Sequence, residues 1–201
     1  KLAALCMERY RASFHYGVDI QALGEAGGRI THVKTSMGDI QADAFVMAMG
    51  SYSPLYLKPL GIDIPVYPMK GYSITFPAND KTPVMSITDD NLKIVYSRLG
   101  DRIRVAGTAE FAGYNSDVRK ARIDPILRGV GQLFPEADLS KIDEWACLRP
   151  STPDGPPIIG PTRIPNLFLN TGHGTLGWTQ AAGSGKLLAD IIDQAPTDIA
   201  L

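Results

Sequence analysis

The chain has 201 residues, of which 44% are hydrophobic and 20% are charged, and its formal net charge at pH 7 is -1. This length allows one large domain or two small ones, and the composition is ordinary for a globular protein. With no basic block, the charge does not indicate binding to nucleic acid, and no apolar run approaches the ~20 residues of a transmembrane helix. Cys6 and Cys147 belong to no metal-binding spacing, so we expect no metal site, no disulfide scaffold and a reducing compartment.

The first 65 residues have the alternating pattern of an α/β fold. Residues 2–14 have helical spacing, and residues 15–20, 30–35 and 40–43 have short strand-like patterns. Residues 44–49 are apolar throughout and end at Gly50, which predicts a parallel strand buried on both faces with a ligand crevice at its carboxyl end. The chain begins inside the first helical pattern, so we expect it to be the C-terminal part of a longer protein.

Residues 66–150 read instead as an antiparallel sheet with one helix. Strand patterns occupy residues 66–76, 84–88, 92–98 and 102–107, and turn-prone residues separate them. We expect a helix that Ser116 or Asp117 caps and that ends at Phe134, with Pro125 as a kink or a break. A further strand is expected at residues 142–148, before a proline-rich loop that begins at Arg149.

The last fifty residues contain the stretch that indicates a ligand site most directly. An apolar strand at residues 167–169 leads into a glycine-rich turn, and a helix with an apolar stripe follows it. This order directs backbone N–H groups and the positive end of a helix dipole at whatever lies in front of the turn. Because Gly172, Gly174 and Gly177 carry no Cβ, we expect a flat or charged ligand to approach the backbone there.

The predicted fold class is therefore α/β (α+β), with a division into three segments. Residues 1–65 and 151–201 form one domain, and residues 66–150 form an antiparallel sheet with a helix between them. We expect the substrate to lie between the two domains, where ligand sites commonly occur.

Three kinds of side chain are candidates for the chemistry. The planar guanidinium of Arg149 suits a carboxylate held by two hydrogen bonds, although a structural ion pair or a loop clamp would explain it as well. His173 either touches a ligand at the entrance to the helix or only hydrogen-bonds its own loop. The strand tyrosines Tyr67, Tyr72 and Tyr96 either present hydroxyls to a pocket or pack in the core. There is no Gly-x-Ser-x-Gly nucleophile, which argues against a hydrolytic triad.

Several motifs together resemble the flavin-dependent D-amino acid dehydrogenases, within the wider group of glycine oxidases and D-amino acid oxidases. The motifs that carry the resemblance are Gly17-Val-Asp-Ile20, Ala48-Met-Gly50, Tyr67-Pro-Met-Lys-Gly-Tyr72, Leu148-Arg-Pro-Ser-Thr-Pro-Asp-Gly-Pro-Pro-Ile-Ile-Gly160 and Gly172-His-Gly-Thr-Leu-Gly-Trp178. They cover essentially the whole chain in the family's order. In this family an N-terminal Gly-x-Gly-x-x-Gly turn cradles the FAD pyrophosphate, and no such turn precedes the first strand-like pattern of these 201 residues.

The resemblance implies a bacterial flavoprotein with FAD as cofactor and a role for each matching residue. Residues 1–65 and 151–201 would be parts of a Rossmann-like FAD-binding domain, and residues 66–150 would form the substrate-binding domain. Arg149 would hold the substrate carboxylate, Tyr96 would line the substrate pocket and His173 would lie beside the flavin. The residues implied in FAD binding are Val18, Ala48 and Gly50 near the adenosine half, and Gly172, His173, Gly174, Thr175, Leu176 and Gly177 along the flavin ring.

The implied reaction is oxidative deamination of a D-amino acid to a 2-oxo acid and ammonia, with hydride transfer from Cα to flavin N5. Electrons would pass to a quinone or to another acceptor. The protein would be cytoplasmic, with peripheral association with the inner face of the cell membrane left open. Two alternatives remain: an amine oxidase for glycine or sarcosine, and a truncated, non-catalytic chain that lacks the pyrophosphate motif.

Overall fold

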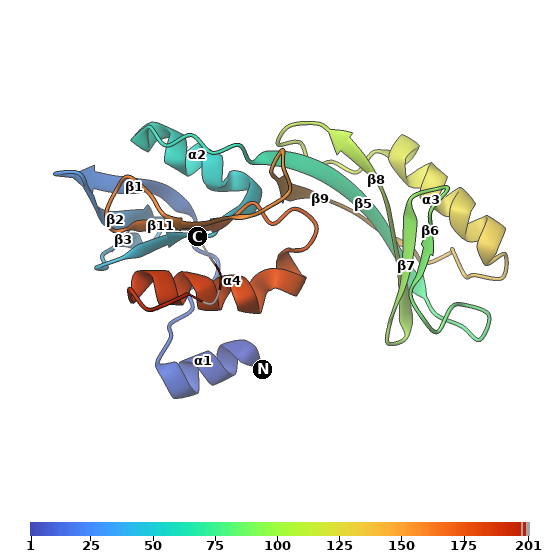
Figure 1. Cartoon of the computed structure of the whole chain (residues 1–201). Coiled ribbons are helices and arrows are strands. Elements are labelled where there is room, and N and C mark those ends of the chain that lie inside the picture. The colour runs from blue at the N-terminus through green and yellow to red at the C-terminus, as the bar shows by residue number, and fades with distance from the viewer. Residues whose placement is uncertain (198, 200–201) are drawn as a thin grey trace.

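The computed structural model describes residues 1–197 and residue 199, and it contains two lobes joined by long strands (Figure 1). The terminal lobe consists of α1, β1–β4, η1, α2, η2, β10, β11 and α4, and the middle lobe consists of β5–β9 and α3. The bounds of the elements are α1 Leu2–Tyr10, β1 Ile20–Ala26, β2 Arg29–Thr35, β3 Gly38–Ile40, β4 Phe45–Met47, η1 Gly50–Tyr52, α2 Ser53–Leu57, η2 Lys58–Leu60, β5 Tyr67–Pro77, β6 Ile87–Asp89, β7 Ile94–Leu99, β8 Arg102–Phe111, α3 Lys120–Leu133, β9 Asp143–Ser151, β10 Ile158–Pro161, β11 Leu167–Thr171 and α4 Gly177–Ile192.

Two small sheets and the C-terminal helix build the terminal lobe. One sheet has the order β10-β11-β4, in which β11 pairs antiparallel with β10 and parallel with β4. The other is the antiparallel sheet β1-β2-β3. The two ends of the sequence meet in one core, because Ile30, Phe45 and Leu57 pack with Leu167 and Leu169. Asn166 strengthens this junction: its Oδ1 accepts from Ile30 N at 3.0 Å, and its Nδ2 donates to Ile30 O at 2.8 Å.

The middle lobe is a five-stranded antiparallel sheet of order β6-β7-β8-β5-β9, with α3 packed on one face (Figure 1). Alternation along the strands sends apolar side chains towards α3. The resulting core is separate from that of the terminal lobe and includes Tyr72, Ile74, Tyr96, Ile103, Val105, Ile123, Ile126 and Val130. The opposite face of the sheet is open, and it carries the side chains described in the next subsection.

The predicted fold class is confirmed, and several of the predicted elements need correction. Residues 15–19 form no strand, and β1 begins only at Ile20. β4 is buried on one face only, because Val46 is 46% exposed at the edge of its sheet. Neither Ser116 nor Asp117 caps α3, which begins at Lys120, and the helix runs through Pro125 to Leu133. Pro125 lies beyond the first turn of α3, so its missing N–H leaves the carbonyl of Ala121 without its usual helical donor, yet the helix continues.

No helix within residues 1–197 and 199 is long and apolar enough to cross a membrane. In the same part of the chain, no group of three His, Cys, Asp or Glu side chains is placed to hold a metal ion. Cys6 and Cys147 are both free thiols.

Candidate functional site

Arg149 lies inside β9, where it faces Met69 of β5, and its side chain extends over the backbone of Gly71. A Cβ built on Gly71 would lie 2.4 Å from the Arg149 Cζ, so only glycine leaves room for the guanidinium in this position. Arg149 forms no ion pair with another residue of the described chain. The prediction that it begins a loop is corrected: a strand holds its backbone, which fixes the direction of the side chain.

A cavity of about 260 Å³ opens beside Arg149 on the open face of the middle sheet. A cavity of this size can hold a small organic molecule such as an amino acid. Two arginines and no carboxylate face it, so it favours an anionic ligand. It is lined by Gly71, Tyr72, Ser73, Arg104, Ala106, Trp145, Cys147, Leu148, Arg149, Pro150, Gly174 and Thr175.

The glycine-rich turn reaches this cavity because it is hydrogen-bonded to the end of β9. Gly174 N donates to Pro150 O at 2.8 Å, and Ser151 and His173 form an isolated antiparallel bridge. Gly174 and Thr175 thereby line the same cavity as Arg149. The structure thus brings together the two motifs that the sequence singled out, although they are about 25 residues apart.

The three glycines of the turn differ in the space around the position that a Cβ would occupy. Gly172 has φ +82° and its Cβ would lie 2.9 Å from the Thr152 side chain, so its own chain fills the space there. Gly174 has φ +54° and nothing lies within 4 Å of a Cβ built on it. Gly177 has only His173 near such a Cβ, at 3.3 Å. Of the three, Gly174 therefore matches the predicted open approach to the backbone best.

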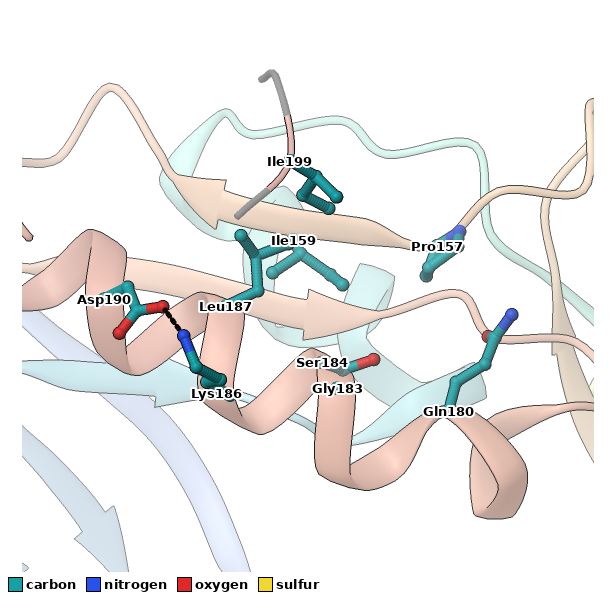
Figure 2. Close-up of a pocket in the computed structure, with 9 residues that line it drawn as sticks. All are labelled: Pro157, Ile159, Gln180, Gly183, Ser184, Lys186, Leu187, Asp190 and Ile199. Carbon is teal, nitrogen blue, oxygen red and sulfur yellow. Dashed lines mark hydrogen bonds and ion pairs between the residues drawn. The ribbon is translucent and has the colours of Figure 1, made fainter. Parts of the chain in front are cut away.

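His173 is half-buried, and its Nε2 lies 2.9 Å from the hydroxyl oxygen of Ser184, which projects from α4 (Figure 2). Burial lowers the pKa of His173 below its ordinary value of 6.5, because the charged imidazolium loses solvation. A neutral imidazole that hydrogen-bonds α4 holds the turn against the helix. This contact supports the structural alternative for His173, and its place beside the flavin remains a prediction.

The N-terminus of α4 offers free N–H groups and open space that suit the negatively charged edge of a flat ring. No side chain caps the helix, so its first N–H groups remain available, and Thr175 and Leu176 just before it are exposed. The open space at Gly174 would admit a flat ring beside these groups. The residues present therefore fit the flavin end of FAD, with the positive helix end directed at developing negative charge.

The predicted adenosine contacts lie on the terminal lobe. Because β4 and β11 are parallel, Ala48 and Gly50 follow β4 at the edge of the sheet where Gly172 follows β11. Thr171 Oγ1 donates to Gly50 O at 3.1 Å, which ties the two strand ends together. Val18 lies half-buried before β1, and the roles of Val18, Ala48 and Gly50 stay predictions.

The structure does not place Tyr96 at the Arg149 cavity, and we correct that expectation. Tyr96 is fully buried beneath α3, and its ring packs edge-on against Phe134 at 5.6 Å between centroids. β7 directs Tyr96 to the core face, whereas Arg104 of the neighbouring strand β8 extends to the cavity. Sequence reasoning missed Gly71, Ser73, Arg104 and Trp145. The period-2 alternation along the strands was a signal for them, but it does not show which face carries the cavity.

A second cavity, of about 360 Å³, lies between α4 and β10 in the terminal lobe (Figure 2). Ile159, Leu187 and Ile199 form an apolar wall, and Lys186 pairs with Asp190 at 2.6 Å. Neither Arg149 nor any other residue that lines the middle-lobe cavity lines this second cavity. We therefore regard the Arg149 cavity as the candidate site.

Comparison with known proteins agrees with this geometry. The family model described as "FAD dependent oxidoreductase", DAO, matches residues 1–191, and the chain belongs to this family. Among curated proteins, the chain is similar to one named D-amino acid dehydrogenase from Granulibacter bethesdensis, with 54% identity over 96% of the chain and 46% of that protein. It is also similar to one of the same name from Methylobacterium radiotolerans, with 52% identity over 100% of the chain and 48% of that protein. The chain thus spans about half the length of these relatives.

Solved structures show the same fold. Glycine oxidase from Bacillus cereus matches with a TM-score of 0.77 and 25% identity, covering 90% of this chain and 52% of that one. Glycine oxidase from Geobacillus kaustophilus matches with a TM-score of 0.83 and 22% identity, covering 94% and 52%. L-proline dehydrogenase from P. horikoshii matches with a TM-score of 0.82 and 21% identity, covering 97% and 54%. Because their sequence identities are below 25%, the last two matches show only a similar fold.

Proposed function

We propose that this chain is the substrate-binding part of an FAD-dependent D-amino acid dehydrogenase, which converts a D-amino acid to a 2-oxo acid and ammonia. The observation that carries the proposal is the unpaired guanidinium of Arg149 in a cavity that also includes the glycine turn. Membership of the FAD-dependent family supports the cofactor, and relatives named D-amino acid dehydrogenase at 50–56% identity support the substrate class.

Arg149 binds the substrate α-carboxylate in this proposal. A guanidinium and a carboxylate form two parallel charged hydrogen bonds, which orient the substrate as well as hold it. Gly71 keeps the guanidinium in place because a side chain there would occupy its position. No carboxylate lines the cavity to compete for it.

The cavity also favours the neutral form of the substrate amine. The guanidinium of Arg149, which lines the cavity, disfavours a positive ammonium on the bound substrate and lowers the pKa of its amine. Loss of that proton frees the nitrogen lone pair, which assists the departure of the Cα hydrogen with its electron pair. Bound FAD supplies the acceptor for these two electrons. The imino acid product then takes up water and releases ammonia, so the cavity needs no carboxylate base.

The principal alternative is a glycine or sarcosine oxidase. A glycine oxidase is among the structural neighbours, at 25% identity, whereas the curated relatives named D-amino acid dehydrogenase share twice that identity. We therefore favour a D-amino acid. Steady-state rates with D-alanine, L-alanine, glycine and sarcosine distinguish the two. Faster turnover of glycine or sarcosine than of any D-amino acid would replace the proposal with the alternative.

We propose further that a quinone accepts the electrons and that the protein is cytoplasmic with peripheral attachment to the membrane. These parts rest on the family resemblance. They predict reduction of a soluble quinone analogue faster than of oxygen, and sedimentation of the complete protein with lipid vesicles. Equal rates with oxygen and with the quinone analogue would contradict the proposed electron acceptor. Absence of the protein from the vesicle pellet would contradict the proposed membrane attachment.

The direct test of the site is Arg149→Ala in the complete protein. KM for the D-amino acid is expected to rise about 10-fold or more, since a hydrogen bond to a charged group contributes roughly 1.5–3 kcal/mol. Flavin content is expected to stay unchanged. An unchanged KM would exclude Arg149 as the carboxylate-binding residue. The 201-residue chain expressed alone tests the remaining alternative: a colourless, folded product would mean that this part does not retain FAD by itself.

A further inference from the structure

Arg104 is the second cation of the cavity, and the proposed reaction does not use it to bind substrate. It extends from β8, and its Nε donates to Thr75 Oγ1 at 3.3 Å. Its guanidinium lies over the ring of Trp145, with Cζ 5.8 Å from the ring centroid. These contacts hold the side chain in one direction, and they use only one of its five N–H groups as a hydrogen-bond donor.

Two other arginines of the middle lobe pair with carboxylates, whereas Arg104 and Arg149 do not. Arg102, two residues earlier on β8, pairs with Asp143, and Arg119 pairs with Glu110 at 2.7 Å. Arg104 and Arg149 have no ion-pair partner in the described chain, and both line a cavity without Asp or Glu. A substrate with a single carboxylate would neutralise only one of these two charges.

The positions of the two guanidiniums suit a ligand with two anionic groups. Arg149 extends to Gly71, and Arg104 lies over Trp145, which faces Ser73 across the strand pair β5–β9. The Arg104 side chain lies between Thr75, which its Nε contacts, and Trp145, which pairs with Ser73, so the two guanidiniums are separated by about 7 to 13 Å along the extended strand β5. A four-carbon to five-carbon dicarboxylic amino acid can place one carboxylate near each guanidinium over such a separation.

Ser73 adds an unused hydrogen-bonding group at the same place. Its side chain is 4% exposed and lines the cavity, and its hydroxyl has no hydrogen-bond partner in the described structure. Buried hydroxyls are normally paired, so an acceptor supplied by a ligand would satisfy it once the side chain rotates about Cα–Cβ.

We propose that Arg104, together with Ser73, forms a second anion subsite that binds the side-chain carboxylate of an acidic D-amino acid. The inference rests on the proposed function and deepens it, since it names D-glutamate and D-aspartate as the substrate class. Arg149 holds the α-carboxylate and Arg104 holds the side-chain carboxylate. D-Glutamate reaches further towards Arg104 and is the better substrate of the two.

The test compares D-glutamate with its neutral isostere D-glutamine in the complete flavin-loaded protein. We expect the wild type to favour D-glutamate in kcat/KM, and Arg104→Gln to lower kcat/KM for D-glutamate about 10- to 100-fold. D-Glutamine is expected to change less than about threefold. Arg104→Glu should reverse the preference towards D-lysine. Arg102→Gln is the matched control, because it removes a cation of the same strand that pairs with Asp143 outside the cavity.

Binding without turnover separates this inference from the proposed function. Calorimetry is performed with glutarate and with butyrate, which differ by one carboxylate. Tighter binding of glutarate that Arg104→Gln abolishes supports the subsite, even in a protein that oxidises no D-amino acid. A protein that oxidises D-alanine but binds both acids equally, or prefers D-glutamine to D-glutamate, overturns the subsite and leaves the proposed function standing. An equal loss of kcat/KM for D-glutamate and D-glutamine in Arg104→Gln would also overturn the subsite.

Discussion

Gly71→Ala tests whether the bare backbone beneath Arg149 is part of the substrate site. The new Cβ would lie 2.4 Å from the Arg149 Cζ and Nη2 and 2.8 Å from Nε. Nonbonded carbon and nitrogen atoms do not approach so closely, so the guanidinium must move. Because the clashing atoms are the far end of a flexible side chain, the backbone of β5 need not change.

The size of the effect follows from what the displaced guanidinium loses. A charged hydrogen bond contributes roughly 1.5–3 kcal/mol, which corresponds to about 10- to 140-fold in binding. A displaced guanidinium retains part of its long-range attraction, so we expect the lower end, about 10-fold in KM. Stability is expected to change little, since alanine fits an extended strand.

The assay measures KM and kcat for a D-amino acid in the complete protein, with flavin content and melting temperature as checks. Gly131→Ala is the matched control, because a Cβ at Gly131 meets nothing within 4 Å. The double variant Gly71→Ala with Arg149→Ala should be no worse than Arg149→Ala alone, since both act through one side chain. Full additivity of the two effects, or an unchanged KM in Gly71→Ala, would refute the reasoning.

Three further predictions concern stability. Leu57→Ala, in the terminal core with no exposed surface, should lower the free energy of unfolding by about 2–5 kcal/mol in chemical denaturation, whereas Leu55→Ala on the same helix, 50% exposed, should change it by less than about 0.5 kcal/mol. The lowered pKa of His173 means that the folded state favours the neutral ring, so stability is complete above pH 6.5 and falls as the pH drops through the folded-state pKa; melting curves at stepwise lower pH should show this fall, and His173→Gln should reduce it. Tyr72 donates to Glu110 at 2.5 Å, and burial raises the pKa of Tyr72 to about 12, so ultraviolet titration should find at least one tyrosine still protonated at about pH 11. Tyr72→Phe should lower the number of such tyrosines by one and lower the melting temperature by about 3–6 °C. If all the tyrosines of the wild-type protein titrate near pH 10, the last prediction is contradicted.

The sequence was sufficient to predict the order and class of most elements. The apolar run before Gly50, the strand at residues 167–169 and the helix after the glycine turn all form, because patterns of one period extend over enough residues. Boundaries were less accurate. Residues 15–19 have a strand-like composition, yet β1 begins at Ile20, where pairing with Thr35 becomes available.

The candidate site was predictable only in part. Arg149 and the glycine turn carry local signals, and the structure joins them through Gly174 and Pro150. The open face of the middle sheet could not be predicted, since alternation gives two faces without showing which of them a helix covers. For that reason Tyr96 was expected at the cavity, where Arg104 extends instead.

The most direct test of the central claim is the visible absorption spectrum of the complete protein under anaerobic conditions. We predict flavin bands that bleach when a D-amino acid is added and that remain when its L-isomer is added. Arg149→Ala should keep the bands and require a much higher concentration of the D-isomer for bleaching. A flavin-containing protein whose spectrum no D-amino acid changes, or that bleaches equally with both isomers, would contradict the account.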